Sequence, residues 1–218
     1  MRVEFPRRPH RPDAFLLMIV LFAAWFNVER VLAETPAAAG PHTTTMIVFA
    51  ERIMPEGEWT ALMDSLRRGA ASAAEETPQL RGGFEVLRGE MIPRGLHVDV
   101  PISIYLHGDC RLVPRPFTIA RGTLGWVMRV NGRIEPFVHV DCTRLVEMLS
   151  PMALGMTQNR RNTVMGEAIT RVILHEWIHI ATQNAKHARR GVEKSEFGVM
   201  DLLADDAQMR VVRGRKKG

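Results

Sequence analysis

The residues best suited to chemistry lie in one short stretch, His175-Glu176-Trp177-Ile178-His179, which matches the pattern H-E-x-x-H. On a helix, His175 and His179 are four residues apart and share a face, so both imidazole rings can reach one small cation. Glu176 follows the first histidine, and its carboxylate can accept a proton from a water molecule on that cation. Because short motifs also occur by chance, the surrounding residues must support this interpretation.

The surrounding residues predict that the motif lies on a long helix. Apolar side chains recur at helical spacing, at Ile169, Val172, Ile173 and Ile180. No proline or glycine interrupts the chain from Glu167 to Asn184, and Thr163 or Asn162 is suited to cap the start of the helix. The alternative is an amphipathic helix with incidental histidines, but burial of two histidines and an acid without a partner is unfavourable.

A catalytic zinc ion usually has three protein ligands and a water molecule, so a third ligand is required. His187 lies twelve residues after His175 and needs only a tight turn beyond the helix. Neutral imidazole is also a strong zinc ligand. The alternatives are Glu193 and Glu196, which follow His179 by 14 and 17 residues, or a later aspartate such as Asp201.

Residues 165–203 resemble the zincin metallopeptidases, and among them the metzincins. The usual metzincin pattern is H-E-x-x-H-x-x-G-x-x-H, but this chain has Thr182 at the glycine position and Ala185 at the third histidine position. It is more similar to a group of uncharacterised secreted bacterial proteins with H-E-x-x-H-x7-H, in which a glycine and an Asp-Leu pair follow the third histidine. The corresponding residues here are His187, Gly191 and Asp201-Leu202.

This resemblance implies an α+β, zincin-like fold, with a mixed sheet packed on helices, an active-site helix and a small C-terminal helical part. It also implies a zinc site, and it favours His187 as the ligand beside His175 and His179. In metzincin-like folds, an antiparallel edge strand above the active-site helix pairs with extended substrate. A hairpin is predicted at residues 124–140, and one of its strands could have that role. An ordinary sheet hairpin is an equally good interpretation.

The N-terminal residues 1–33 have the features of a secretory signal peptide. A basic start precedes a 13-residue apolar run, Ala14 to Phe26, and Val31-Leu32-Ala33 predicts cleavage after Ala33. The run is shorter than the roughly 20 residues that span a bilayer, although an uncleaved anchor is the alternative. We therefore expect a secreted or periplasmic protein, with no membrane partner after cleavage.

The mature chain is predicted to hold one domain, residues 45–212, between a flexible lead-in at 34–44 and a basic tail at 213–218. Removal of residues 1–33 lowers the formal net charge from +5 to about +3. Much of the remaining positive charge lies near the tail, which is typical of a solvated terminus. We therefore expect no nucleic-acid partner.

Within the domain, the pattern of apolar residues and breakers predicts alternating strands and helices. The Asn131-Gly132 pair favours a two-residue hairpin turn. Pro101 lies in a different predicted strand and indicates that part of that strand is at a sheet edge or a bulge. The expected strands are Thr45–Ala50, Phe84–Leu87, Val98–Leu106, Leu124–Val130 and Ile134–Val140. The expected helices run from Pro55 to before Pro78, from Thr143 to Leu149, through the motif, and from Val199 to Val212, with a loop at Ser150–Asn162.

The chain contains two cysteines, Cys110 and Cys142. An oxidising destination favours a disulfide bond between them, and two buried thiols are the alternative. They lie far upstream of the motif and lack paired spacing, so we do not expect them to bind zinc.

Taken together, these features predict a secreted zinc metallopeptidase that hydrolyses peptide bonds in a peptide or protein substrate. His175, His179 and His187 would bind Zn²⁺, and Glu176 would be the general base. The alternatives are a secreted, non-catalytic binding module with a structural zinc ion, and a zincin domain anchored by its N-terminal segment. The sequence specifies neither the substrate nor the oligomeric state.

Overall fold

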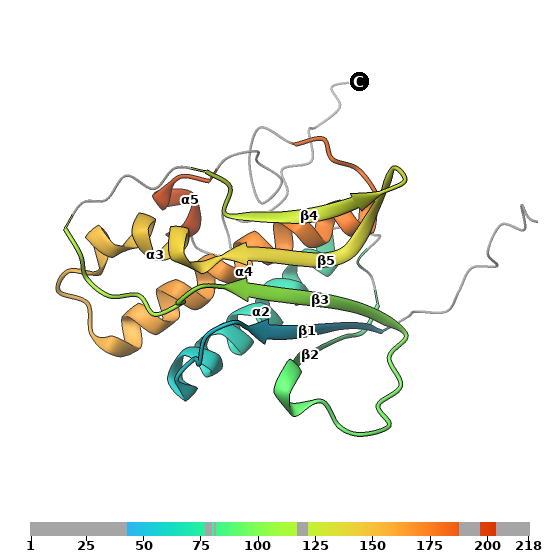
Figure 1. Ribbon diagram of the computed structural model, residues 1–218, viewed down its shortest axis with the longest axis horizontal. Coiled ribbons are helices and arrows are strands. Elements are labelled where there is room, and N and C mark those ends of the chain that lie inside the picture. Colours follow the sequence, from blue (N-terminus) through green and yellow to red (C-terminus); the bar gives the residue numbers. More distant parts are fainter. Residues whose placement is uncertain (1–42, 77–79, 81, 117–121, 188–196, 204–218) are drawn as a thin grey trace, which may run out of the picture. The chain divides into compact units, whose positions relative to one another are not determined.

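A mixed sheet of five strands organises the part of the chain that a computed structural model describes (Figure 1). The described residues are 43–76, 80, 82–116, 122–187 and 197–203. They all belong to one compact unit that comprises residues 41–218. The predicted signal peptide, nearly all of the lead-in and the basic tail lie outside the described residues.

The strands lie in the order β2-β1-β3-β5-β4. Their bounds are β1 Thr44–Ala50, β2 Phe84–Arg88, β3 Val100–His107, β4 Gly125–Val130 and β5 Arg133–Asp141. The pairs β1–β2, β1–β3 and β3–β5 are parallel, whereas β4 at the edge is antiparallel to β5. The sheet is therefore parallel apart from one antiparallel edge strand.

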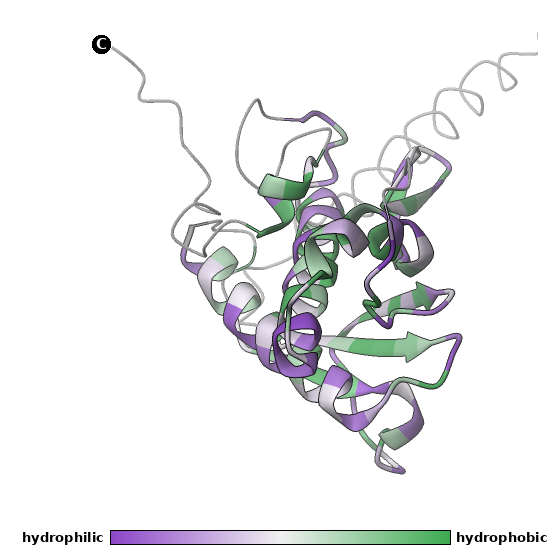
Figure 2. Ribbon diagram, turned by 90° about the vertical axis from the view of Figure 1, so that its left-hand side faces the viewer, coloured by the Kyte–Doolittle hydropathy of each residue, from purple (hydrophilic) through white to green (hydrophobic). Residues whose placement is uncertain are grey.

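Two long helices, α2 (Glu56–Glu76) and α4 (Gln158–Thr182), pack against each other. In Figure 2 they lie on one side of the sheet, and α4 also contacts β4 and β5. At the helix crossing, a Cβ atom added to Gly166 would lie 2.9 Å from the backbone of Ala61, so glycine permits the close approach. No helix among the described residues is long and apolar enough to cross a membrane.

The two faces of the sheet differ because side chains alternate along each strand. One set of alternate side chains is buried in the core: Met46, Val48, Ile102, Ile104, Leu106, Val138 and Val140. The other face carries rings that stack from strand to strand, with centroids 5.0–5.4 Å apart: Phe49, Tyr105, His139 and Trp126.

The structure confirms the predicted strands to within about two residues at each end. Asn131 and Gly132 both have positive φ, 50° and 81°, as the predicted turn requires. Pro101 lies in the first part of β3, which pairs with β1 alone, because β5 joins from Ser103 onward. Proline is tolerated there because one side of the strand has no partner strand at that position.

The prediction for the start of the motif helix was wrong. Helix α4 begins at Gln158, and its cap is the Thr157 hydroxyl, which accepts a hydrogen bond from the Arg160 amide at 3.3 Å. The expected cap residue Thr163 lies inside the helix, where its hydroxyl donates to the Asn159 carbonyl. The expected loop at 150–162 therefore contains a short 3-10 helix, Ser150–Ala153, and the first residues of α4.

Two shorter helices complete the fold. Helix α3 (Cys142–Leu149) begins directly after β5, and its cap is Asp141, whose carboxylate accepts from the Arg144 amide at 3.0 Å. Helix α5 is described from Val199 to Leu203. The rest of the predicted C-terminal helix, to Val212, lies outside the described residues.

The predicted disulfide bond between Cys110 and Cys142 is present, and both cysteines are buried. It links the segment after β3 to the first residue of α3. This bond closes a loop that contains the β4–β5 hairpin.

Candidate metal centre

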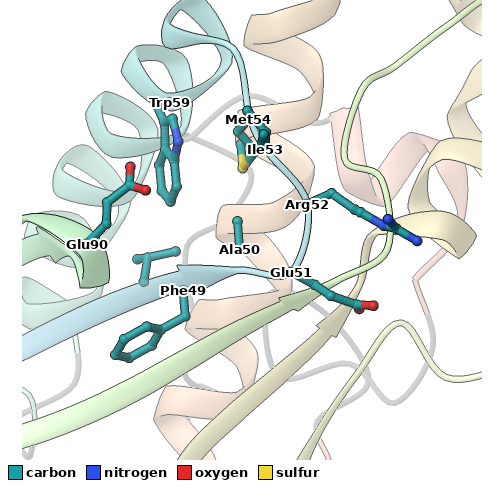
Figure 3. Close-up of a pocket in the computed structure, with 9 residues that line it drawn as sticks. Phe49, Ala50, Glu51, Arg52, Ile53, Met54, Trp59 and Glu90 are labelled. Carbon is teal, nitrogen blue, oxygen red and sulfur yellow. The ribbon is translucent and has the colours of Figure 1, made fainter.

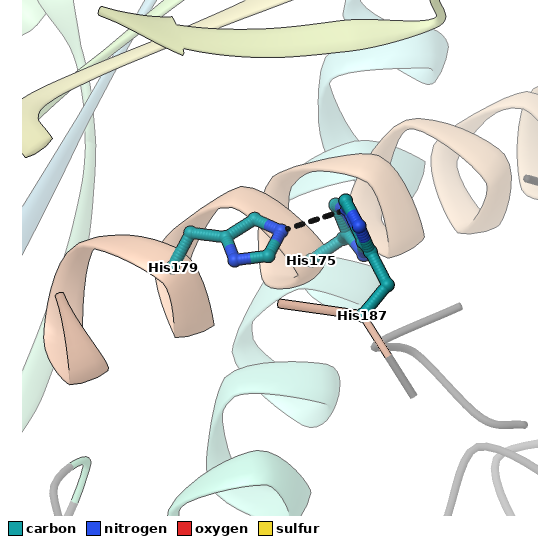
Figure 4. Close-up of side chains that lie close together, drawn as sticks. All are labelled: His175, His179 and His187. Atoms are coloured by element: carbon teal, nitrogen blue, oxygen red, sulfur yellow. Dashed lines mark hydrogen bonds between the residues drawn. The ribbon is translucent and has the colours of Figure 1, made fainter. Parts of the chain in front are cut away.

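Three histidines converge at the C-terminal part of α4 (Figure 4). His175 and His179 lie on the helix and are 7% and 6% exposed, whereas His187 follows the helix and is exposed. The Nε2 atom of His179 lies 3.0 Å from Nε2 of His175 and 3.3 Å from Nε2 of His187. The structure thus brings together the three residues that were predicted as metal ligands.

The spacing of these nitrogens fits a single metal ion. In a tetrahedral site with bonds of about 2.0–2.1 Å, ligand atoms lie roughly 3.3 Å apart. The ring of His179 is nearly perpendicular to those of His175 and His187, at 90° and 87°. The rings of His175 and His187 are stacked, with 7° between their planes. The ligand atoms of all three histidines lie within 4.8 Å of one another, so the cluster could hold a metal ion.

A backbone carbonyl selects the tautomer of His179. Its Nδ1 atom lies 2.6 Å from the carbonyl oxygen of Asn184. Because a carbonyl only accepts hydrogen bonds, Nδ1 must carry the proton, and the lone pair of Nε2 is left to face the other two histidines. Such an outer hydrogen bond is typical of metal-binding histidines.

A sharp turn after α4 brings His187 back toward the helix. The turn begins at Gln183, which caps the helix in the left-handed conformation, with φ 51° and ψ 29°. One residue later, the Asn184 side chain accepts a hydrogen bond from the Lys186 amide at 3.0 Å. These contacts define the short path from the end of the helix to His187.

Glu176 lies on α4 beside the first histidine and is 6% exposed. Burial raises the pKa of its carboxyl group to about 7. The edge strand β4 comes close to it, since a Cβ atom added to Gly125 would lie 3.5 Å from Glu176 Oε1. The same atom would lie 2.3 Å from Val172 Cγ1, so glycine is needed for this close approach of the strand to the helix.

The segment before α5 also touches the cluster. The ring of Phe197 packs edge-on against His175, with centroids 5.4 Å apart. Asp201, one of the candidate third ligands, accepts a hydrogen bond from the Gly198 amide at 2.8 Å and is not part of the histidine cluster. The two candidate glutamates, Glu193 and Glu196, lie outside the described residues.

Two further histidines lie on the opposite face of the sheet from α4. His107 Nε2 and His139 Nδ1 are 3.0 Å apart, so the two rings share a hydrogen bond. A separate pocket of about 230 Å³ lies at the end of β1, next to the start of α2, and is lined in part by Met54, Trp59 and Glu90 (Figure 3). None of the three clustered histidines lines this pocket.

Searches of protein-family models, curated proteins and solved structures found no match to this chain. Its function is therefore inferred from its own residues.

Sequence reasoning did not identify the contributions of Gly125, Gln183 and Asn184. Gly125 acts through the missing side chain, and Asn184 acts on His179 through a backbone carbonyl. Neither contribution leaves a recognisable pattern of residue types in the sequence.

Proposed function

We propose that this protein is a secreted zinc metallopeptidase with a zincin-like fold. The observation that carries the proposal is the convergence of three imidazole rings, two of which lie on the helix that also carries the buried carboxyl group of Glu176. Three histidines and one open position form a typical catalytic zinc site. The cluster formed by the described residues contains three histidines, and a fourth protein ligand would instead favour a structural zinc ion.

His175, His179 and His187 would hold the zinc ion through their Nε2 atoms. The bound ion would polarise the scissile carbonyl group and lower the pKa of a bound water molecule toward about 7. Glu176 would accept the proton of that water molecule and pass it to the leaving amine. In the metal-free site, burial raises the pKa of this carboxyl group to about 7, so that it exchanges protons near neutral pH.

The edge strand supports a peptide as the substrate. Strand β4 pairs with β5 along one side only and is antiparallel to it, and its first residue, Gly125, lies next to Glu176. An extended peptide can add to such an edge through backbone hydrogen bonds. A peptide bound there would place its backbone close to the proposed base, in the arrangement that the resemblance to metzincins implies.

The proposed export agrees with the disulfide bond, because such bonds persist in oxidising compartments. Peptide mapping of the N-terminus of the purified protein tests the proposed export, and we expect a chain that begins at Glu34. A chain that retains residues 1–33 would instead indicate an anchored protein.

The activity is tested by incubation of zinc-loaded protein with a broad peptide library, with cleavage detected by mass spectrometry. We expect cleavage that stops when a chelator removes the metal and returns when zinc is added. Cleavage that persists after complete metal removal would contradict the mechanism. The absence of cleavage by fully zinc-loaded protein would favour a non-catalytic binding module.

A further inference from the structure

Gln183 connects the end of α4 to the first part of β5. Its side-chain Nε2 donates to the Ile134 carbonyl oxygen at 2.9 Å, and its Oε1 accepts from the Ile134 amide at 2.9 Å. Nε2 also lies 2.8 Å from the Ile180 carbonyl oxygen, within the last turn of the helix. One side chain thus joins two elements that are 49 residues apart in the sequence.

This contact takes the place of a strand neighbour. Strand β3 pairs with β5 from Phe137 onward, so Ile134 lies before the region that β3 covers. On the other side, Ile134 is opposite Arg129 of β4. The primary amide of Gln183 offers one donor and one acceptor, as a paired strand residue would. It therefore fixes α4 relative to the β4–β5 hairpin.

The backbone of Gln183 indicates that the contact is important for the local conformation. A left-handed residue at a helix end is usually glycine or asparagine, because other side chains are strained there. Gln183 adopts this conformation with φ 51°. Its three side-chain hydrogen bonds offset part of that strain and hold the chain where it leaves the helix.

The metal ligands depend on the same turn. Asn184, the next residue, supplies the carbonyl that holds the His179 ring. His187 follows three residues later and brings its Nε2 atom within 3.3 Å of His179. A change in the direction of the chain at Gln183 would move both groups.

We propose that Gln183 is a positioning residue, which holds the turn with Asn184 and His187 in place against the β4–β5 hairpin. It would thereby set the metal ligands relative to the strand that accepts the substrate. This inference rests on the proposed function, because it assigns Gln183 a role at the same metal site.

The test compares Gln183→Met with Gln158→Met in the full mature protein. Both variants exchange a glutamine for a side chain of similar length on or next to α4. Gln158 lies at the opposite end of the helix, and among the described residues its side chain bonds to two neighbours in the first turns of α4, Arg161 and Asn162. The zinc dissociation constant is measured by competition with a chromophoric chelator. Thermal unfolding of the metal-free proteins reports any general loss of stability.

We expect Gln183→Met to raise the zinc dissociation constant about tenfold or more, as is typical for loss of a residue that supports a metal ligand. Gln158→Met should leave it unchanged. Hydrogen exchange at the Ile134 amide should become faster in metal-free Gln183→Met, because its acceptor is removed. Gln183→Asn should also weaken zinc binding, since asparagine tolerates the left-handed backbone but is too short to reach Ile134. This variant replaces Gln183→Met if the latter does not fold.

Equal zinc affinity in the Gln183 variants and Gln158→Met would overturn the inference, even if the Gln183 variants unfold at a lower temperature. That result would give Gln183 a structural role only and would leave the proposed function intact. If the wild-type protein binds no zinc, both the proposed function and this inference are wrong.

Discussion

The Nδ1 atom of His179 lies 2.6 Å from the carbonyl oxygen of Asn184, which belongs to the turn that leads to His187. One side of the His179 ring thus contacts the turn, while Nε2 on the other side faces the remaining two histidines. The turn contributes both an outer contact and a candidate ligand. The candidate metal centre is therefore formed jointly by α4 and the residues that follow it.

This arrangement predicts that His187→Ala weakens zinc binding by more than about a hundredfold, since loss of a direct ligand should exceed the 10–100-fold effect of an outer contact. Glu193→Ala and Glu196→Ala serve as matched controls and should leave zinc binding nearly unchanged. Equilibrium dialysis or chelator competition measures the affinities. If a glutamate variant loses the metal and His187→Ala retains it, the assignment of the third ligand is wrong.

The disulfide bond between Cys110 and Cys142 should stabilise the domain. The double variant Cys110→Ser/Cys142→Ser is expected to lose roughly 2–4 kcal/mol of unfolding free energy, because the bond restricts the unfolded chain. Urea unfolding of both proteins measures this difference. Wild-type protein from an oxidising compartment should contain no titratable thiol before reduction, and the detection of two thiols would refute the bond.

The burial of Glu176 predicts a pH-dependent stability of the metal-free protein. Its pKa is raised from the ordinary value of 4.5 to about 7 in the folded state. The folded protein then holds this proton more tightly than the unfolded chain does. The contribution of protonated Glu176 to the free energy of unfolding is fully present below about pH 4.5 and is lost as the pH rises through about 7.

Glutamine cannot ionise, so Glu176→Gln should remove this dependence. As the pH rises from 4.5 to 8, the free energy of unfolding of the metal-free variant should increase relative to that of wild type by up to about 3 kcal/mol. Each pKa unit corresponds to about 1.4 kcal/mol. Chemical denaturation at both pH values, with a chelator present, measures the difference. An identical offset between the two proteins at both pH values would show that the pKa of Glu176 is the same in the folded and unfolded chains, which contradicts the raised value in the folded protein.

Much of the fold followed from local patterns in the sequence. Strict alternation identified the strand that contains Ile102 and Ile104, and Asn131-Gly132 located the hairpin turn. These features are local because each depends on neighbouring residues. The proposed metal ligands could also be predicted from the sequence, since His175 and His179 lie four residues apart on a helix and His187 lies a short turn beyond.

Contacts between distant segments could not be read from the sequence. The bond from Gln183 to Ile134 depends on where the hairpin packs, and the approach of Gly125 to Glu176 depends on the position of β4 at the sheet edge. The start of α4 was misplaced because Thr157 and Thr163 are both suitable caps by residue type. The helix is capped by Thr157, the earlier of the two, so it begins further upstream of the motif than predicted.

The most direct test of the proposed mechanism is a comparison of Glu176→Gln with wild type at equal zinc content. Zinc content is measured by elemental analysis, and cleavage of the same peptide substrate is measured for both. We predict that the variant binds zinc normally and loses hydrolysis by several orders of magnitude, because Glu176 handles the proton and does not coordinate the metal. Near-normal hydrolysis by the zinc-loaded variant would exclude Glu176 as the base and contradict the proposed mechanism.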